Sequence, residues 1–101
     1  MNAKGRIRFA APGQAQPETF EVTIEGVEDL RGAVGVIENS IISHARHSWD
    51  SDQAGAPIQT KLGDGTAEDP EWWQMSVYVG TMAGSYRPAV ILVAFQVWKA
   101  L

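Results

Sequence analysis

One stretch near the end of the sequence constrains the fold more than any other. From Ala89 to Phe95 every residue is apolar, and the run is rich in β-branched side chains. It is far shorter than the ~20 residues that cross a bilayer, so it favours a central strand buried on both faces. Alternation along that strand predicts two rows of side chains, Ile91, Val93, Phe95 and Val97 on one face and Val90, Leu92, Ala94 and Trp98 on the other.

Composition predicts one soluble domain, residues 1–101, with a single modest core. Hydrophobic residues make up 45% and charged residues 20% of the 101, which is close to globular averages. The absence of Cys excludes disulfides and Cys-based chemistry. The first residues lack the apolar segment of a secretory signal, and no stretch is long enough to span a membrane. We therefore expect a cytoplasmic protein with no membrane contact.

The net charge of −4 and pI near 5.0 argue against a surface that neutralises phosphates. Nucleic acid is therefore not an expected partner. The alternating Lys4, Arg6 and Arg8 are interpreted as solvated charges that pair with Glu21 and Glu25 across a hairpin.

Periodicity predicts the order ββαββ. Residues 6–10 and 19–25 alternate as strands of a first hairpin, and residues 72–80 and 88–98 form a second. Between them, from about residue 28 to about residue 48, apolar side chains recur at helical spacing. These are Leu30, Val34, Ile37, Ile41 and Ala45. We expect a two-layer α+β fold, with a four-stranded antiparallel sheet in the order 1-2-4-3, covered on one face by a single long helix.

Residues 50–71 are predicted to form an acidic loop between the helix and the second hairpin. The segment contains Gly and Pro, and six acidic residues against one Lys give a local charge of −5. A short extra strand is allowed near residues 57–62. Asp64, Glu68 and Asp69 are candidate contacts for a basic partner.

No catalytic or metal motif stands out. Asp50 begins a sequence like a calcium loop, but its twelfth position is Lys61 where a Glu is required. His44 and His47 share a helix face, yet two His are too few for a zinc site, and a role at the helix C-terminus explains them. Nucleophile motifs and phosphate-binding loops are absent. We predict no enzyme, no metal and no cofactor.

The candidate partner-binding site on the sheet consists mainly of aromatic residues. Trp72, Tyr78, Leu92 and Trp98 are predicted to lie on the sheet face that the helix leaves uncovered, with Tyr86 and Arg87 at its rim.

These features predict a small acidic protein-binding module, an inhibitor or accessory protein of the anti-defence type found in phages and mobile elements. This class rests on analogy of size, charge and fold. Two alternatives remain open. The same sheet face could assemble the protein into a homodimer or ring, or the protein could be a small-ligand binder or an enzyme with a pocket under residues 50–71.

Overall fold

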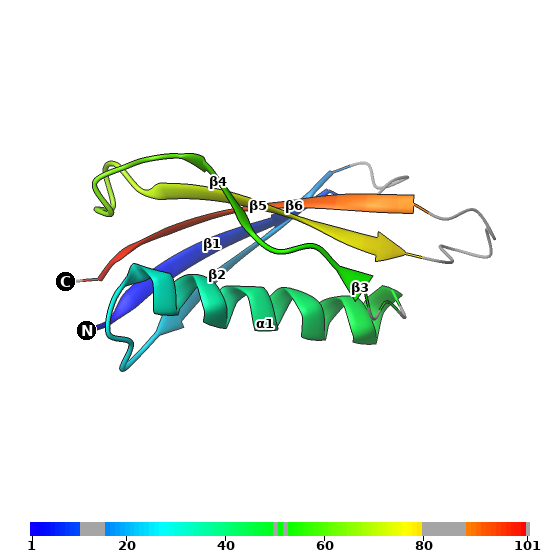
Figure 1. Ribbon diagram of the computed structural model, residues 1–101, viewed down its shortest axis with the longest axis horizontal. Coiled ribbons are helices and arrows are strands. Elements are labelled where there is room, and N and C mark those ends of the chain that lie inside the picture. Colours follow the sequence, from blue (N-terminus) through cyan, green and yellow to red (C-terminus); the bar gives the residue numbers. More distant parts are fainter. Residues whose placement is uncertain (11–15, 50, 52, 80–88, 101) are drawn as a thin grey trace.

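A computed structural model describes residues 1–10, 16–49, 51, 53–79 and 89–100. In these residues one helix packs on one face of a six-stranded antiparallel sheet, an α+β architecture of two layers (Figure 1). The elements in chain order are β1 (Ala3–Phe9), β2 (Glu18–Ile24), α1 (Leu30–Trp49), β3 (Gln53–Ala54), β4 (Ile58–Lys61), β5 (Glu71–Val79) and β6 (Ala89–Lys99). Within the described part of the chain, no helix is both long and apolar enough to cross a membrane.

The strand order is β2-β1-β6-β5-β3, with β4 also paired to β5. The predicted four strands in the order 1-2-4-3 are therefore wrong in both number and order. The last strand pairs with the first, β1, and β2 lies at the edge. The burial of the two strands agrees with these positions, because alternate residues of β1 are buried whereas most of β2 is exposed.

Small residues at the beginning of β1 allow this strand to lie inside the sheet, beneath the helix. Ala3 and Gly5 face the helix and are buried, and the Cβ of any larger residue at position 5 would meet the Ile37 side chain. These small residues let α1 lie close to the sheet. The sequence prediction missed them because it began the first strand at residue 6.

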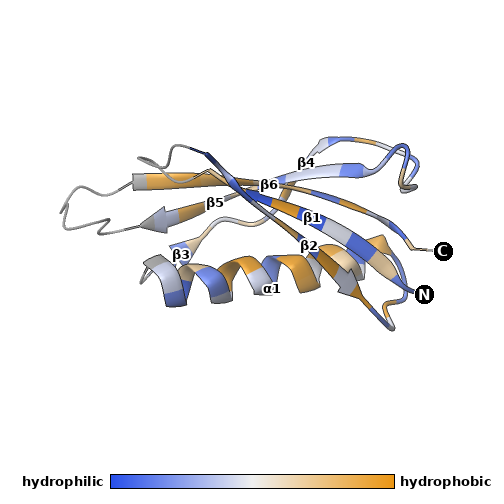
Figure 2. Ribbon diagram, turned by 180° about the vertical axis from the view of Figure 1, so that it is seen from behind, coloured by the Kyte–Doolittle hydropathy of each residue, from blue (hydrophilic) through white to orange (hydrophobic). Residues whose placement is uncertain are grey.

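The core lies between α1 and the inward rows of β1, β5 and β6. All five predicted positions of the helix stripe are buried, and they pack on the predicted row of β6. Hydrophobic residues concentrate along β6 and along α1 (Figure 2). The buried residues of the core are Ala3, Ile7, Phe9, Ile24, Leu30, Ala33, Val34, Ile37, Ile41, Ala45, Met75, Val77, Ile91, Val93, Phe95 and Val97.

The helix begins at Leu30, because Asp29 caps it. The Asp29 carboxylate accepts a hydrogen bond of 2.9 Å from the backbone N–H of Gly32, which satisfies one of the helix's unpaired amides. Glu28 and Asp29 therefore precede the helix, and Arg46 and His47 lie in its last turn.

The acidic segment contributes two strands to the sheet. β4 lies where the sequence allowed a short extra strand, and both β3 and β4 pair with the outer edge of β5. The turn of the acidic segment that contains Gly65 contacts the end of β6, where the Lys99 N–H donates a hydrogen bond of 2.9 Å to the Gly65 carbonyl. This segment thus extends the sheet sideways. Among the described residues, no helix or strand covers the face opposite α1 (Figure 1).

Candidate functional site

We call the sheet surface that points away from α1 the open face. Its side chains come from the positions that alternate with the buried rows, and cross-strand pairing fixes their neighbours. The rows are Thr23–Lys4–Trp98, Glu21–Arg6–Gln96–Trp72–Lys61, Thr19–Arg8–Ala94–Gln74–Ile58, Leu92–Ser76 and Val90–Tyr78. The basic residues and both tryptophans therefore occupy one part of the face, and Leu92, Val90 and Tyr78 occupy the other.

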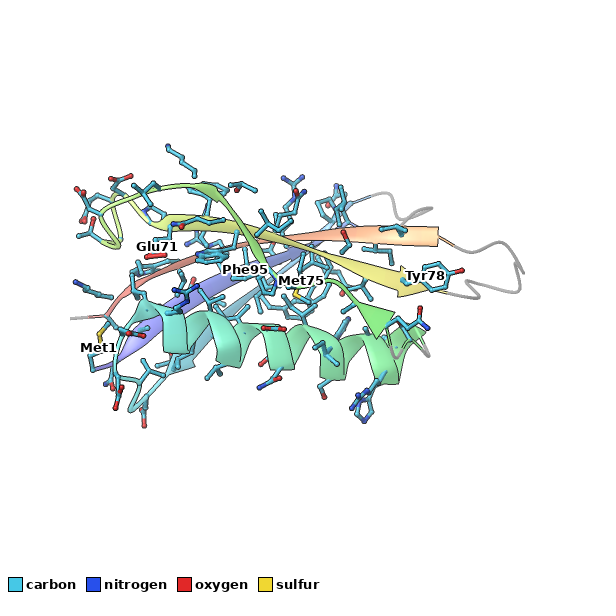
Figure 3. All side chains as sticks on the ribbon, viewed as in Figure 1. Met1, Glu71, Met75, Tyr78 and Phe95 are labelled. Carbon is cyan, nitrogen blue, oxygen red and sulfur yellow. The ribbon has the colours of Figure 1, made fainter. Side chains whose placement is uncertain are left out.

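Four predicted site residues, Trp72, Tyr78, Leu92 and Trp98, lie on the open face. Leu92 is 52% exposed and Tyr78 is 41% exposed. Val90, on β6, pairs with Tyr78 on β5 and is 57% exposed, so it extends the apolar surface. Tyr78 lies near the end of β5 farthest from Glu71 (Figure 3), and Leu92 and Val90 pair with Ser76 and Tyr78 toward that end.

The predicted rim residues Tyr86 and Arg87 lie outside the described residues.

Trp98 is on the open face but is only 8% exposed. The Arg6 guanidinium lies over its ring, 5.6 Å from the centroid, a distance at which a cation is attracted to the aromatic face. Arg6 also forms an ion pair of 3.6 Å with Glu21. Trp98 therefore packs under a side chain of its own sheet.

Trp72 is half-buried and lines a hollow in the open face. The hollow measures about 170 Å³ and has apolar and basic walls. Its lining includes Arg6, Arg8, Thr19, Trp72, Ala94 and Gln96. The volume suits a single side chain of a partner better than a drug-sized ligand, which needs roughly 300–1,000 Å³.

Arg6 and Arg8 are the site residues that sequence reasoning left out. Their alternation with Lys4 placed all three on one side of a strand, but the strand was assumed to lie at the sheet edge. Because β1 lies between β2 and β6, the two Arg side chains reach the middle of the open face. Pairing of Arg6 with Glu21 is confirmed.

The predicted acidic contacts lie in the turn between β4 and β5. The Asp69 carboxylate accepts a hydrogen bond of 3.0 Å from the Asp64 N–H and thereby holds the turn. Asp64 and Glu68 are exposed. Of the three, these two therefore present charge most openly to a partner.

A second hollow lies on the helix side, between the start of α1 and strands β4 to β6. It measures about 430 Å³. In its wall, one oxygen of Glu71 accepts hydrogen bonds from Trp73 Nε1 at 3.3 Å and Gln59 Nε2 at 3.4 Å. Trp73 stacks on Phe95 with a centroid distance of 6.4 Å. We call this hollow the helix-side cleft.

The two histidines of α1 have structural neighbours. The His44 ring lies 4.5 Å from that of Phe9 and 5.9 Å from that of Phe20. His47 Nδ1 lies 2.8 Å from the Ser43 carbonyl. Across the part of the chain that is described, no three His, Cys, Asp or Glu side chains are grouped to hold a metal ion.

No protein-family model, curated protein or solved structure matches this chain. The open face and the helix-side cleft are therefore the observations from which a function can be inferred.

Proposed function

We propose that the protein is a small, non-enzymatic protein-binding module and that the open face is its contact surface. The exposed row of Val90, Leu92 and Tyr78 carries this proposal, because it lies on a sheet face that no described element covers. Ile58, at 69% exposed, adds to the same surface from β4. Burying apolar surface is favourable by roughly 25 cal/mol per Å², and contiguous exposed patches mark interaction sites.

The acidic turn supplies a second contact in this proposal. Asp64 and Glu68 are exposed beside the sheet and would meet basic groups at the margin of the partner's surface. Rim charges of this kind act mainly on association rate and specificity. A role as an inhibitor or accessory protein follows if occupation of the partner's surface blocks the partner's activity.

The test removes apolar surface without adding charge. The double variant Leu92→Thr with Val90→Thr places β-branched residues, which suit a strand, at both positions, and Val36→Thr is the control on α1. Val36 is 42% exposed on α1. Protein captured from cells by the immobilised wild type is identified, purified and bound again in a titration of each variant.

The expected result is a loss of affinity of about tenfold or more in the double variant, with Val36→Thr unchanged. Circular dichroism checks that the double variant remains folded. Equal binding by the wild type and the folded double variant would refute the open face as the contact surface.

Self-assembly is the second candidate, favoured by the same exposed row. Two copies would bury Leu92 and Val90 against each other in an isologous contact. Light scattering behind size exclusion decides between the candidates. A dimer that persists on dilution and becomes a monomer in the Leu92→Thr, Val90→Thr variant would replace the first proposal.

The helix-side cleft is the observation that favours a small ligand. Its volume of about 430 Å³ falls within the range of small-molecule sites, and Trp73 and Glu71 would offer a ring and a carboxylate. A thermal-shift screen of metabolites tests this candidate. A stabilising compound whose effect is lost in Glu71→Gln supports it, and a flat screen argues against it.

A further inference from the structure

Basic side chains gather on the open face although the protein as a whole is acidic. Lys4, Arg6 and Arg8 project from β1, and Lys61 pairs with Trp72 from β4. Among the described strand residues of this face, Glu21 is the only acid. The face is thus cationic in a chain whose net charge is −4. Such segregation of charge selects partners by electrostatic complementarity.

The two Arg residues are not equivalent. Arg6 is already bound within the sheet, by Glu21 at 3.6 Å and by the Trp98 ring at 5.6 Å. Arg8 is exposed and has no ion pair within the described residues. A guanidinium can hold a carboxylate with two parallel hydrogen bonds. Arg8 is therefore the residue of this face best placed to bind an incoming anion.

Apolar groups adjoin this cation on two sides. Arg8 and Trp72 both line the hollow of about 170 Å³. Arg8 also pairs with Ala94, and Leu92 occupies the next outward position of β6. A ligand that satisfies this surface needs a negative charge and apolar side chains within a few residues of each other.

We propose that the open face binds a segment of a partner protein in which acidic and apolar side chains lie side by side. A carboxylate of the segment pairs with Arg8, one apolar side chain enters the hollow beside Trp72, and others cover Leu92 and Val90. This inference rests on the proposed protein-binding function and adds the chemistry of the partner. It differs from the sequence-based expectation of a basic partner, which the acidic turn alone supported.

A polypeptide fits the face better than a nucleic acid strand, which would also bring negative charge. Stacking of bases requires open aromatic rings, but Trp98 lies beneath Arg6. The exposed apolar residues of the open face, among those described, are aliphatic except for Tyr78.

Fluorescence anisotropy with three labelled probes tests the proposal. The probes are an alternating Glu-Leu peptide of about 12 residues, a Lys-Leu peptide of equal length, and an oligothymidine of about 12 nucleotides. We expect the Glu-Leu peptide to bind tightest, with affinity falling as NaCl rises from about 50 to about 500 mM.

Matched charge reversals locate the contact. Arg8→Glu should weaken binding of the Glu-Leu peptide by about tenfold or more. Arg31→Glu makes the same change of net charge on the exposed start of α1 and should alter affinity by less than about twofold. Equal effects of the two reversals would mean that only net charge matters and would overturn the proposal.

Tighter binding of the Lys-Leu peptide or of oligothymidine would also overturn it, as would failure of all three probes to bind. Failure of this proposal is distinguishable from failure of the proposed function. If the captured partner depends on Leu92 and Val90 but not on Arg8, the face binds protein and only the acidic chemistry is wrong. If the partner depends on none of them, the protein-binding function of the face is itself refuted.

Discussion

Replacement of Trp98 by Ala should destabilise the fold far more than replacement of Leu92, although both lie on the open face. Trp98 is 8% exposed, whereas Leu92 is 52% exposed. Removal of a buried aromatic side chain costs about 3–5 kcal/mol. Truncation of a half-exposed leucine at a face without a neighbour layer should cost about 0.5–1 kcal/mol.

These costs translate into measurable shifts in a urea titration. With an unfolding slope of about 1.5 kcal/mol per M, Trp98→Ala should lower the midpoint by about 2–3 M and Leu92→Ala by about 0.5 M. The Arg6 side chain over the ring should couple to Trp98 by about 0.5–1 kcal/mol in a double-mutant cycle with Arg6→Ala. Far-ultraviolet circular dichroism is the appropriate probe, because it reports mainly the backbone and depends less on the removed indole than fluorescence does.

Equal midpoints for Trp98→Ala and Leu92→Ala would refute the assignment of Trp98 to packing. Trp98 would then be available to a partner, as its place among the predicted contacts required. If Trp98→Ala is too unstable to titrate, Trp98→Phe keeps part of the burial and should lie between Trp98→Ala and the wild type. A midpoint for Trp98→Phe equal to that of the wild type would show that Phe replaces the buried indole without loss.

Three further changes test the local structure. Asp29→Ala removes the helix cap, so it should cost about 1 kcal/mol of stability and lower the melting temperature by about 5 °C. Asp29→Asn should retain most of the stability, because Asn also caps helices. Equal melting temperatures for Asp29→Ala and Asp29→Asn would contradict the cap. Gly63→Ala should destabilise the β4–β5 turn, because a Cβ there would overlap the backbone before β5. Gly35 has open space around it, so Gly35→Ala should instead stabilise the helix by up to about 1 kcal/mol. Thermal melts in which Gly35→Ala is the less stable of the two variants would contradict this geometry. Gly5→Ala brings a Cβ to 2.5 Å from Ile37 Cδ1 and should lower the free energy of unfolding by about 1–3 kcal/mol in chemical denaturation. Adding Ile37→Val should recover part of that loss, because it removes Cδ1. Losses of stability that simply add in the double variant would argue against the contact.

The strand order could not be predicted from the sequence because it depends on contacts between distant segments. The predicted order put the strand of residues 19–25 at an inner position, next to the last strand. The structure places Ala3 and Gly5 under α1, where their small size decides the close approach of helix and sheet. Small residues give a weak local signal, so this preference becomes visible only in the packed structure.

The candidate site was predicted in part. Period-two alternation correctly assigned Trp72, Tyr78, Leu92 and Trp98 to one face, since that assignment needs only the geometry of each strand. It did not reveal that Trp98 is covered, because the covering guanidinium comes from Arg6, ninety-two positions earlier in the chain.

Local patterns in the sequence were sufficient to specify two of the main elements. The apolar run of β6 and the helical stripe of α1 specify a buried strand and a covering helix, because their side-chain periods match the two backbone geometries. The packed structure adds that β1 lies beside β6, that residues 53–61 extend the sheet edge, and that no described helix or strand covers the face opposite α1. That same pairing sets Arg6 and Arg8 among tryptophans in the middle of the open face. The physical reason is that strand register joins residues far apart in the chain, and it is chosen by the packing of the whole core.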